Sequence, residues 1–145
     1  MLHQLSSGDA CVPLSTFAEF KCRAACFIDF NSLASATSTV ESKQASCAVA
    51  FSDNTSLYVH AVPSGTLLGS IEHPAPYAIH GLRMNADNSL LAVGNGPNVD
   101  LYSVTLSDDG NVKLLLLHTY HAPLARFDIN HVQPAGFSKG NDLLV

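Results

Sequence analysis

Histidine has the clearest chemical potential in this chain, because it binds metals and exchanges protons near neutral pH. Of the seven histidines, His118, His121 and His131 come closest to the spacing of metal ligands. A helix or tight turn could gather three such side chains around zinc. In a strand, residues three positions apart point to opposite faces of the sheet. Because the surrounding residues favour a strand, we expect structural or surface roles for these histidines and no bound metal.

Acid–base and nucleophilic chemistry have weaker support. Asp108 and Asp109 lie in a turn pattern, where aspartate favours the turn itself. The other aspartates considered are dispersed along the chain: Asp29, Asp53, Asp87 and Asp100. No Gly-x-Ser-x-Gly elbow is present, and no helix pattern follows the glycine-rich Gly94–Pro97 to bind a phosphate. We therefore assign no catalytic, cofactor-binding or metal-binding residue and expect no cofactor.

The four cysteines are Cys11, Cys22, Cys26 and Cys47. Cys22 and Cys26 are separated by three residues, and no second pair follows at zinc-finger spacing. We expect these cysteines to be small buried thiols in strands.

Composition limits the class of protein and its partners. The 145 residues are enough for about one domain, and 13% charged residues is about half the usual fraction. A net charge of −5 argues against nucleic acid as the main partner. The chain lacks an apolar run of the ~20 residues that a spanning helix needs, and its N-terminus does not resemble a secretory signal. The expected compartment is the cytoplasm, with the nucleus as an alternative.

The chain contains two internal sequence repeats. Ala48–Val62 (AVAFSDNTSLYVHAV) and Ala92–Val104 (AVGNGPNVDLYSV) both read as strand, polar turn and strand. Met84–Leu91 (MNADNSLL) returns as Phe137–Leu144 (FSKGNDLL), displaced by 53 residues. A strand-rich repeat of roughly 40–50 residues is typical of β-propellers, in which each blade is a four-stranded sheet.

Alternating apolar residues and turn residues place the strands. Lys21–Asn31 should place Cys26, Ile28 and Phe30 on one face of a strand, and Ala25, Phe27 and Asp29 on the other. The further strands are expected at Ser46–Phe51, Leu57–Val62, Thr66–Glu72, Tyr77–Met84, Ser89–Val93, Val99–Leu106 and Val112–Tyr120. No segment predicts a convincing helix, although 122–131 could form one turn.

These strands give an all-β chain of antiparallel four-stranded meander blades. Residues 1–20 are an irregular lead-in or an incomplete blade, and 21–145 are a partial propeller. Its blades are expected at about 24–73 and about 77–121, with a third beginning at 123–145. His73 and His121 occupy matching positions, where each is expected to cap a blade entry by bonding a backbone group or hydroxyl of a neighbouring strand. The tyrosines Tyr58, Tyr77, Tyr102 and Tyr120 are expected mostly to pack between blades.

The chain resembles the WD-repeat β-propellers over roughly residues 24–145. Phe137-Ser138, Leu90–Val93 and Gly65–Leu68 match the repeat pattern. The Trp-Asp pair is replaced by His60-Ala61 and Tyr102-Ser103, so the family's Asp–His–Ser–Trp network cannot be assembled whole.

The resemblance implies a non-catalytic scaffold in a multiprotein complex. Such a scaffold presents loops to protein partners, and the candidate loops are Ser52–Thr55, Asn85–Asn88 and Gly94–Asn98.

One blade also resembles the lactonase-type (YVTN-like) propellers, and this gives a hydrolase as the alternative function. The likeness rests on Asn98, Val99, Tyr102, Asp109, Gly110 and Leu114–Leu117, and it assigns no catalytic residue.

Two and a half blades do not close a ring, since propellers need at least about four. We expect the chain to be a fragment of a longer propeller. The alternatives are assembly with copies or a partner that supply the missing blades, and a compact antiparallel sandwich.

Overall fold

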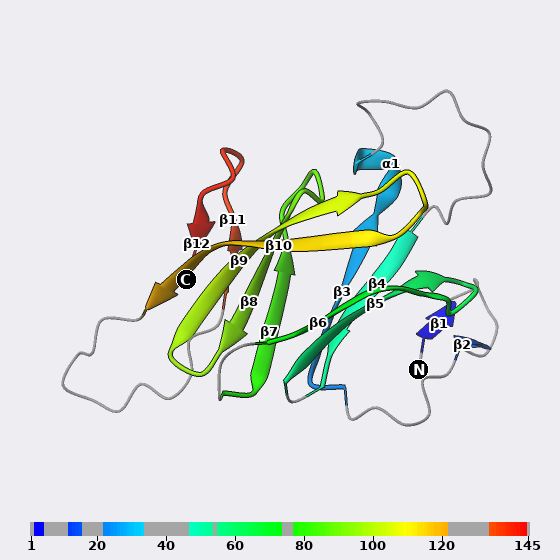
Figure 1. Cartoon of the computed structure of the whole chain (residues 1–145), viewed down its shortest axis with the longest axis horizontal. Coiled ribbons are helices and arrows are strands. Elements are labelled where there is room, and N and C mark those ends of the chain that lie inside the picture. The colour runs from blue at the N-terminus through cyan, green and yellow to red at the C-terminus, as the bar shows by residue number, and fades with distance from the viewer. Residues whose placement is uncertain are drawn as a thin grey trace.

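The computed structural model describes residues 2–4, 12–15, 22–33, 47–53, 55–73, 77–121 and 134–144. Two four-stranded antiparallel sheets, each a simple meander, dominate it (Figure 1). The first sheet contains β3 (Ala24–Asp29), β4 (Cys47–Ser52), β5 (Ser56–Val62) and β6 (Leu67–Glu72). The second contains β7 (Ile79–Met84), β8 (Leu90–Asn95), β9 (Asn98–Leu106) and β10 (Val112–His121). The predicted all-β class and its meander sheets are confirmed.

Two short hairpins lie outside these sheets. They are β1 (Leu2–Gln4) with β2 (Val12–Ser15), and β11 (Gly136–Phe137) with β12 (Leu143–Leu144). The prediction of no helix is wrong by one turn, because α1 (Phe30–Leu33) follows β3. The possible turn at 122–131 lies outside the described residues.

The core lies between the two large sheets, which face one another. Alternation along β3 directs Ile28 inward and leaves Phe27 exposed, as the period of two predicts. The buried cluster combines apolar side chains of both sheets, including Ile28, Val59, Leu82 and Tyr102. Strand β3 lies against β7, and β6 lies against β10.

Two asparagine turns repeat the same geometry 53 residues apart. Asn88 joins β7 to β8 and Asn141 joins β11 to β12, with φ of 60° and 64°. The Asn88 N–H donates to the Asn85 carbonyl, and the Asn141 N–H donates to the Ser138 carbonyl. Asparagine tolerates this left-handed conformation better than most residues. The displacement seen in the sequence is therefore a repeat of the backbone as well.

Each of these asparagines also bonds the preceding sheet. The Asn88 Oδ1 accepts from the Asp29 N–H at 3.1 Å, and the Asn141 Oδ1 accepts from Asn85 Nδ2 at 3.1 Å. Both donors lie at the end of the first strand of their sheet. The turn thus links each unit to the one before it.

Strand bounds agree with the predictions to within three residues, with one turn displaced. The predicted turn Gly94–Asn98 is wrong at both ends, because Gly94 and Asn95 belong to β8 and Asn98 begins β9. Gly94 pairs with Val99, and Asn95 with Asn98, so only Gly96 and Pro97 remain to reverse the chain. Gly96 adopts φ of 53°, which glycine tolerates.

Candidate functional site

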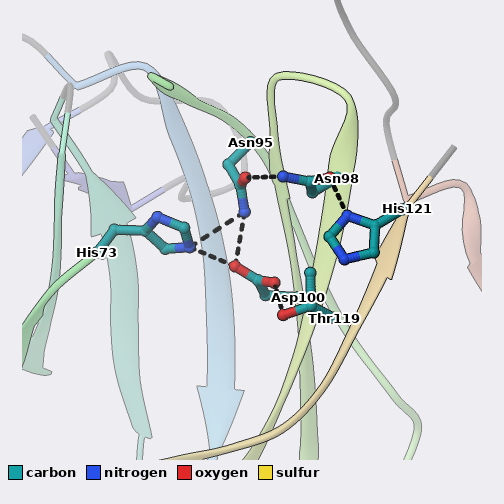
Figure 2. A network of polar contacts seen from close by, with 6 residues as sticks. All are labelled: His73, Asn95, Asn98, Asp100, Thr119 and His121. Atoms are coloured by element: carbon teal, nitrogen blue, oxygen red, sulfur yellow. Dashed lines mark hydrogen bonds and ion pairs between the residues drawn. The ribbon is translucent and has the colours of Figure 1, made fainter. Parts of the chain in front are cut away.

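A buried carboxylate, Asp100 of β9, organises a network of polar side chains (Figure 2). Asp100 is only 3% exposed, although its neighbours along the strand are mostly apolar. It alternates in phase with Tyr102 and Val104, so its side chain lies on the face directed toward the first sheet. An ionised group in this position requires hydrogen-bond donors, since burial without them is costly.

The first carboxylate oxygen, Oδ2, receives two donors. His73, in the segment that follows β6, bonds it through Nε2. Asn95 of β8 donates to the same oxygen from Nδ2 at 2.7 Å. His73 Nε2 and Asn95 Nδ2 lie 3.0 Å apart, and both point at the carboxylate. His73 is 7% exposed and Asn95 is fully buried, so this end of the network is shielded from water.

The second oxygen, Oδ1, accepts a hydrogen bond from the Thr119 hydroxyl of β10 at 2.5 Å. A further pair extends the network toward the surface, because His121 Nδ1 donates to Asn98 Oδ1 at 2.8 Å. Asn98 Nδ2 in turn lies 3.5 Å from Asn95 Oδ1. The segment between the two sheets is thereby tied to three strands of the second sheet.

Two opposing effects set the protonation of Asp100. Burial raises the pKa of its carboxyl. Hydrogen bonds from His73, Thr119 and Asn95, together with the charge of His73, outweigh burial and hold the pKa below its usual value. The carboxylate therefore stays ionised within the fold.

The contacts of this network hold parts of the fold together. Both oxygens of Asp100 are engaged by side chains of the fold. In a nucleophilic triad, a hydroxyl faces the imidazole that activates it. Here the Thr119 hydroxyl faces the carboxylate, and His73 directs Nε2 to the same carboxylate. The arrangement fixes the position of one sheet's linker on the other sheet.

The network both supports and corrects the sequence analysis. His73 bonds a neighbouring strand as expected, but the acceptor in the network is a carboxylate rather than a backbone group or a hydroxyl. His121 bonds the side-chain amide of Asn98. Asp100, treated as a dispersed residue, is the centre of the site. The sequence feature that could have identified it is the single charged residue within the mostly apolar strand pattern of 99–104.

Of the histidines weighed for a metal site, the two that the structure describes, His118 and His121, do not meet. His118 and His121 lie on opposite faces of β10, the former against the Tyr120 ring at a centroid distance of 4.5 Å. His131 lies outside the described residues. Within the described ranges, no group of three or more metal-ligating side chains gathers.

The cysteines are free thiols at three described positions, and Cys11 lies outside them. Cys26 and Cys47 are partly buried in strands, and burial raises the pKa of Cys26 to about 12 against a smaller opposing effect of Arg83. The expectation of burial is wrong for Cys22, which is exposed just before β3.

The expected loops are mostly occupied with internal bonds. Asn85 is buried and Asn88 bonds the first sheet, which leaves Ala86 and Asp87 exposed in that turn. Gly94 to Gly96 are buried. In the first loop, Asp53 Oδ1 accepts the Ser56 N–H at 2.8 Å, while Asn54 lies outside the described residues. Most residues of these turns are therefore buried or make hydrogen bonds within the fold.

Comparisons with known proteins leave the family open: no family model matches the chain, and no curated protein matches it significantly. Within the described residues, no helix is long and apolar enough to cross a membrane.

Proposed function

We propose that this chain is a segment of a WD-repeat-like β-propeller that acts as a non-catalytic scaffold for other proteins in the cytoplasm or nucleus. The observation that carries the proposal is the repeated unit: two four-stranded meanders stacked face to face, with a third begun by the Asn141 turn. Stacked units of this kind are typical of propellers. Their rigidity suits them to hold a binding surface in place.

The surface best suited to a protein partner is the outermost strand of the second sheet. On β10, Leu116 is 41% exposed and Leu117 is 50% exposed. A bulge between Leu116 and His118 leaves Leu117 outside the register with β9. Exposed apolar side chains gathered on one strand mark interaction sites in soluble proteins. We therefore assign Leu116 and Leu117 to partner binding.

Several of the residues on which the lactonase-type resemblance rests make contacts within the fold. This supports the scaffold proposal over the hydrolase alternative. Asn98 bonds His121, and Tyr102 is 3% exposed in the core. Asp109 accepts hydrogen bonds from Ser107 and Asn111 in its own hairpin. No observation among the described residues favours hydrolysis over binding.

The test is identification of partners by proximity labelling in cells, followed by reconstitution with each purified partner. We expect the double variant Leu116→Glu/Leu117→Glu to weaken the affinity for a direct partner at least about tenfold, which corresponds to about 1.4 kcal/mol of binding free energy. Lys113→Glu, on the same strand and exposed, is the matched control. Unchanged affinity in the double variant, or enzymatic turnover of lactones by the purified chain, contradicts the proposal.

A further inference from the structure

Strand β10 forms the outer edge of the second sheet and is the longest strand in the described part of the chain (Figure 1). It pairs with β9 along one side, from Val112 to His121. Among the described residues, no strand pairs with its other side. The unpaired side of an edge strand presents a row of backbone N–H and C=O groups, to which a further strand can bond.

The other edge strands of the two large sheets, β3, β6 and β7, are shorter, with six residues each. Strands β3 and β7 lie against one another between the sheets, and β6 ends in the exposed Glu72. Proteins protect an exposed edge with charged residues, prolines, bulges or a covering segment. On β10 this protection is limited to Lys113 and the bulge at Leu117.

Apolar side chains are exposed on both faces of the sheet along this edge. Leu116 pairs with Tyr102 and lies on the face directed toward the first sheet. Leu115 is 65% exposed and Tyr120 is 42% exposed, and both lie on the opposite face. The bulged Leu117 lies between these positions in the sequence and is also exposed.

The first sheet covers only the beginning of β10. Gly69 of β6 approaches it so closely that a Cβ at this position would lie 2.4 Å from the Val112 carbonyl oxygen. Val112 is buried, whereas each residue of Leu115–His118 is exposed. The contact between the two sheets therefore leaves the middle of β10 open in the described structure.

The two-sided exposure distinguishes between ways in which a partner could bind. A helix or a sheet that lies on one face covers either Leu116 or the pair Leu115 and Tyr120, but not both sets. A strand beside β10 directs its side chains alternately to the two faces, so it contacts both sets and also bonds the unpaired backbone. Lys113 is the only charged residue of β10 and is exposed, so an acidic residue at that end of the added strand is favoured.

We propose that an extended segment of a partner protein adds to the unpaired side of β10 as a fifth strand of the second sheet. The segment has apolar side chains on both faces and an acidic residue beside Lys113. Backbone hydrogen bonds supply most of the affinity in this mode of binding, and the side chains supply the specificity. The inference rests on the proposed scaffold function, because it uses the same strand, and it adds the class of partner.

The probe is a synthetic ten-residue peptide of alternating valine and threonine with a glutamate at each end, which matches the length of β10. Either orientation of this peptide places a glutamate near Lys113. The control peptide has the same side chains and carries N-methyl groups on consecutive central residues. Successive residues of a strand direct their N–H groups to opposite sides, so these methyl groups remove donors from both edges of the peptide.

Hydrogen exchange at the amides of β10, measured by NMR on the purified chain, reports strand addition directly. At saturating concentration, the unmodified peptide should slow exchange at least about tenfold at alternate residues of β10, those whose N–H groups do not bond β9. The N-methylated peptide should leave these rates unchanged. Docking through side chains alone gives no such alternation.

Three matched leucine variants test whether both faces take part. Leu115→Ala and Leu116→Ala should each weaken the binding of the unmodified peptide about two- to fivefold, because each removes a contact with a side chain of the neighbouring strand. Leu67→Ala, at an exposed leucine of β6, should leave the affinity unchanged. Both variants on β10 truncate exposed side chains, so the fold should be retained.

Unchanged exchange with the unmodified peptide overturns the inference, as does equal binding of the N-methylated peptide. A loss of affinity at only one of the two leucines of β10 assigns the site to a partner that lies on one face. Protection of β10 that rises with protein concentration, without peptide, assigns the edge to a second copy and also overturns the inference.

The proposed function fails by a different result, when no cellular partner depends on Leu116 and Leu117. A cellular partner that is weakened there, but whose binding does not protect alternate amides of β10, keeps the scaffold and removes the fifth strand. Protection of β10 by the peptide, with no cellular partner at this surface, does the reverse.

Discussion

Two tyrosines, Tyr58 and Tyr102, follow leucine in the repeated pattern and meet different surroundings. Each lies four residues before the end of its strand, Tyr58 on β5 and Tyr102 on β9. Each lies on the face of its sheet that is directed away from the next unit of the chain. Tyr102 is 3% exposed because the first sheet covers it, and burial with the nearby Asp100 charge raises its pKa to about 12. Tyr58 is only partly buried, against Phe51 at a ring-centroid distance of 5.6 Å.

Tyr102 follows a leucine as Tyr58 does, but it is buried more deeply because the first sheet covers it. The face of the second sheet that meets the first carries the core and Asp100 with its donors. The corresponding face of the first sheet carries buried Val49 and Phe51 beside partly buried Tyr58 and His60, and Phe27 on it is exposed. The repeated pattern therefore predicts where a strand forms and which face each side chain lies on. The packing of one sheet on the other determines how much each side chain contributes to stability.

The largest expected effect is the truncation of the covered tyrosine. Tyr102→Ala should lower the free energy of unfolding by about 3–5 kcal/mol, because it leaves a cavity between the sheets. Tyr58→Ala should cost clearly less in the chain alone, because its side chain is only partly buried. Urea denaturation with both variants measures the contrast. Equal losses at the two positions contradict the role of the neighbouring sheet.

Acid should act on the covered face through Asp100. Because its pKa is lowered in the fold from 3.8, stability from its ionised form is present above that value and lost as pH falls below it. Asp100→Asn should lower stability at neutral pH by about 1.5–3 kcal/mol. It should also reduce the further loss of stability as the pH falls from about 5 through 3.8 and below.

Chemical denaturation across that pH range measures both effects. Asp108→Asn, in an exposed turn, is the matched control and should keep the wild-type profile. An Asp100→Asn profile parallel to that of the wild type would show that this carboxylate does not titrate with folding.

A smaller effect should come from the asparagine that joins the two sheets. Asn88→Gly keeps the left-handed turn but removes the acceptor of the Asp29 N–H. The expected loss is about 0.5–1.5 kcal/mol. Asn88→Asp retains an acceptor oxygen and should stay near the wild type. Hydrogen exchange at the Asp29 amide reports the same bond, and unchanged protection in the glycine variant speaks against it.

The sequence allowed the strands to be predicted and left most of the site hidden. Alternation and turn residues place all eight strands of the two large sheets, because both signals are local. The pairing of His73 with Asp100 spans 27 residues and depends on how the second sheet folds over its own linker. Asn88 was expected as a turn residue, but its bond to Asp29 depends on stacking. The repeat pattern shows which residue types are present, but it does not show which residues far apart in the sequence come into contact.

The most direct test of this account is a double-mutant cycle on His73 and Asp100, measured by urea denaturation. Its premise is that these two side chains hold the segment after β6 against the second sheet. His73→Ala, Asp100→Ala and the double variant should then be non-additive, with a coupling energy of at least about 1 kcal/mol. Additivity within about 0.3 kcal/mol would contradict this premise.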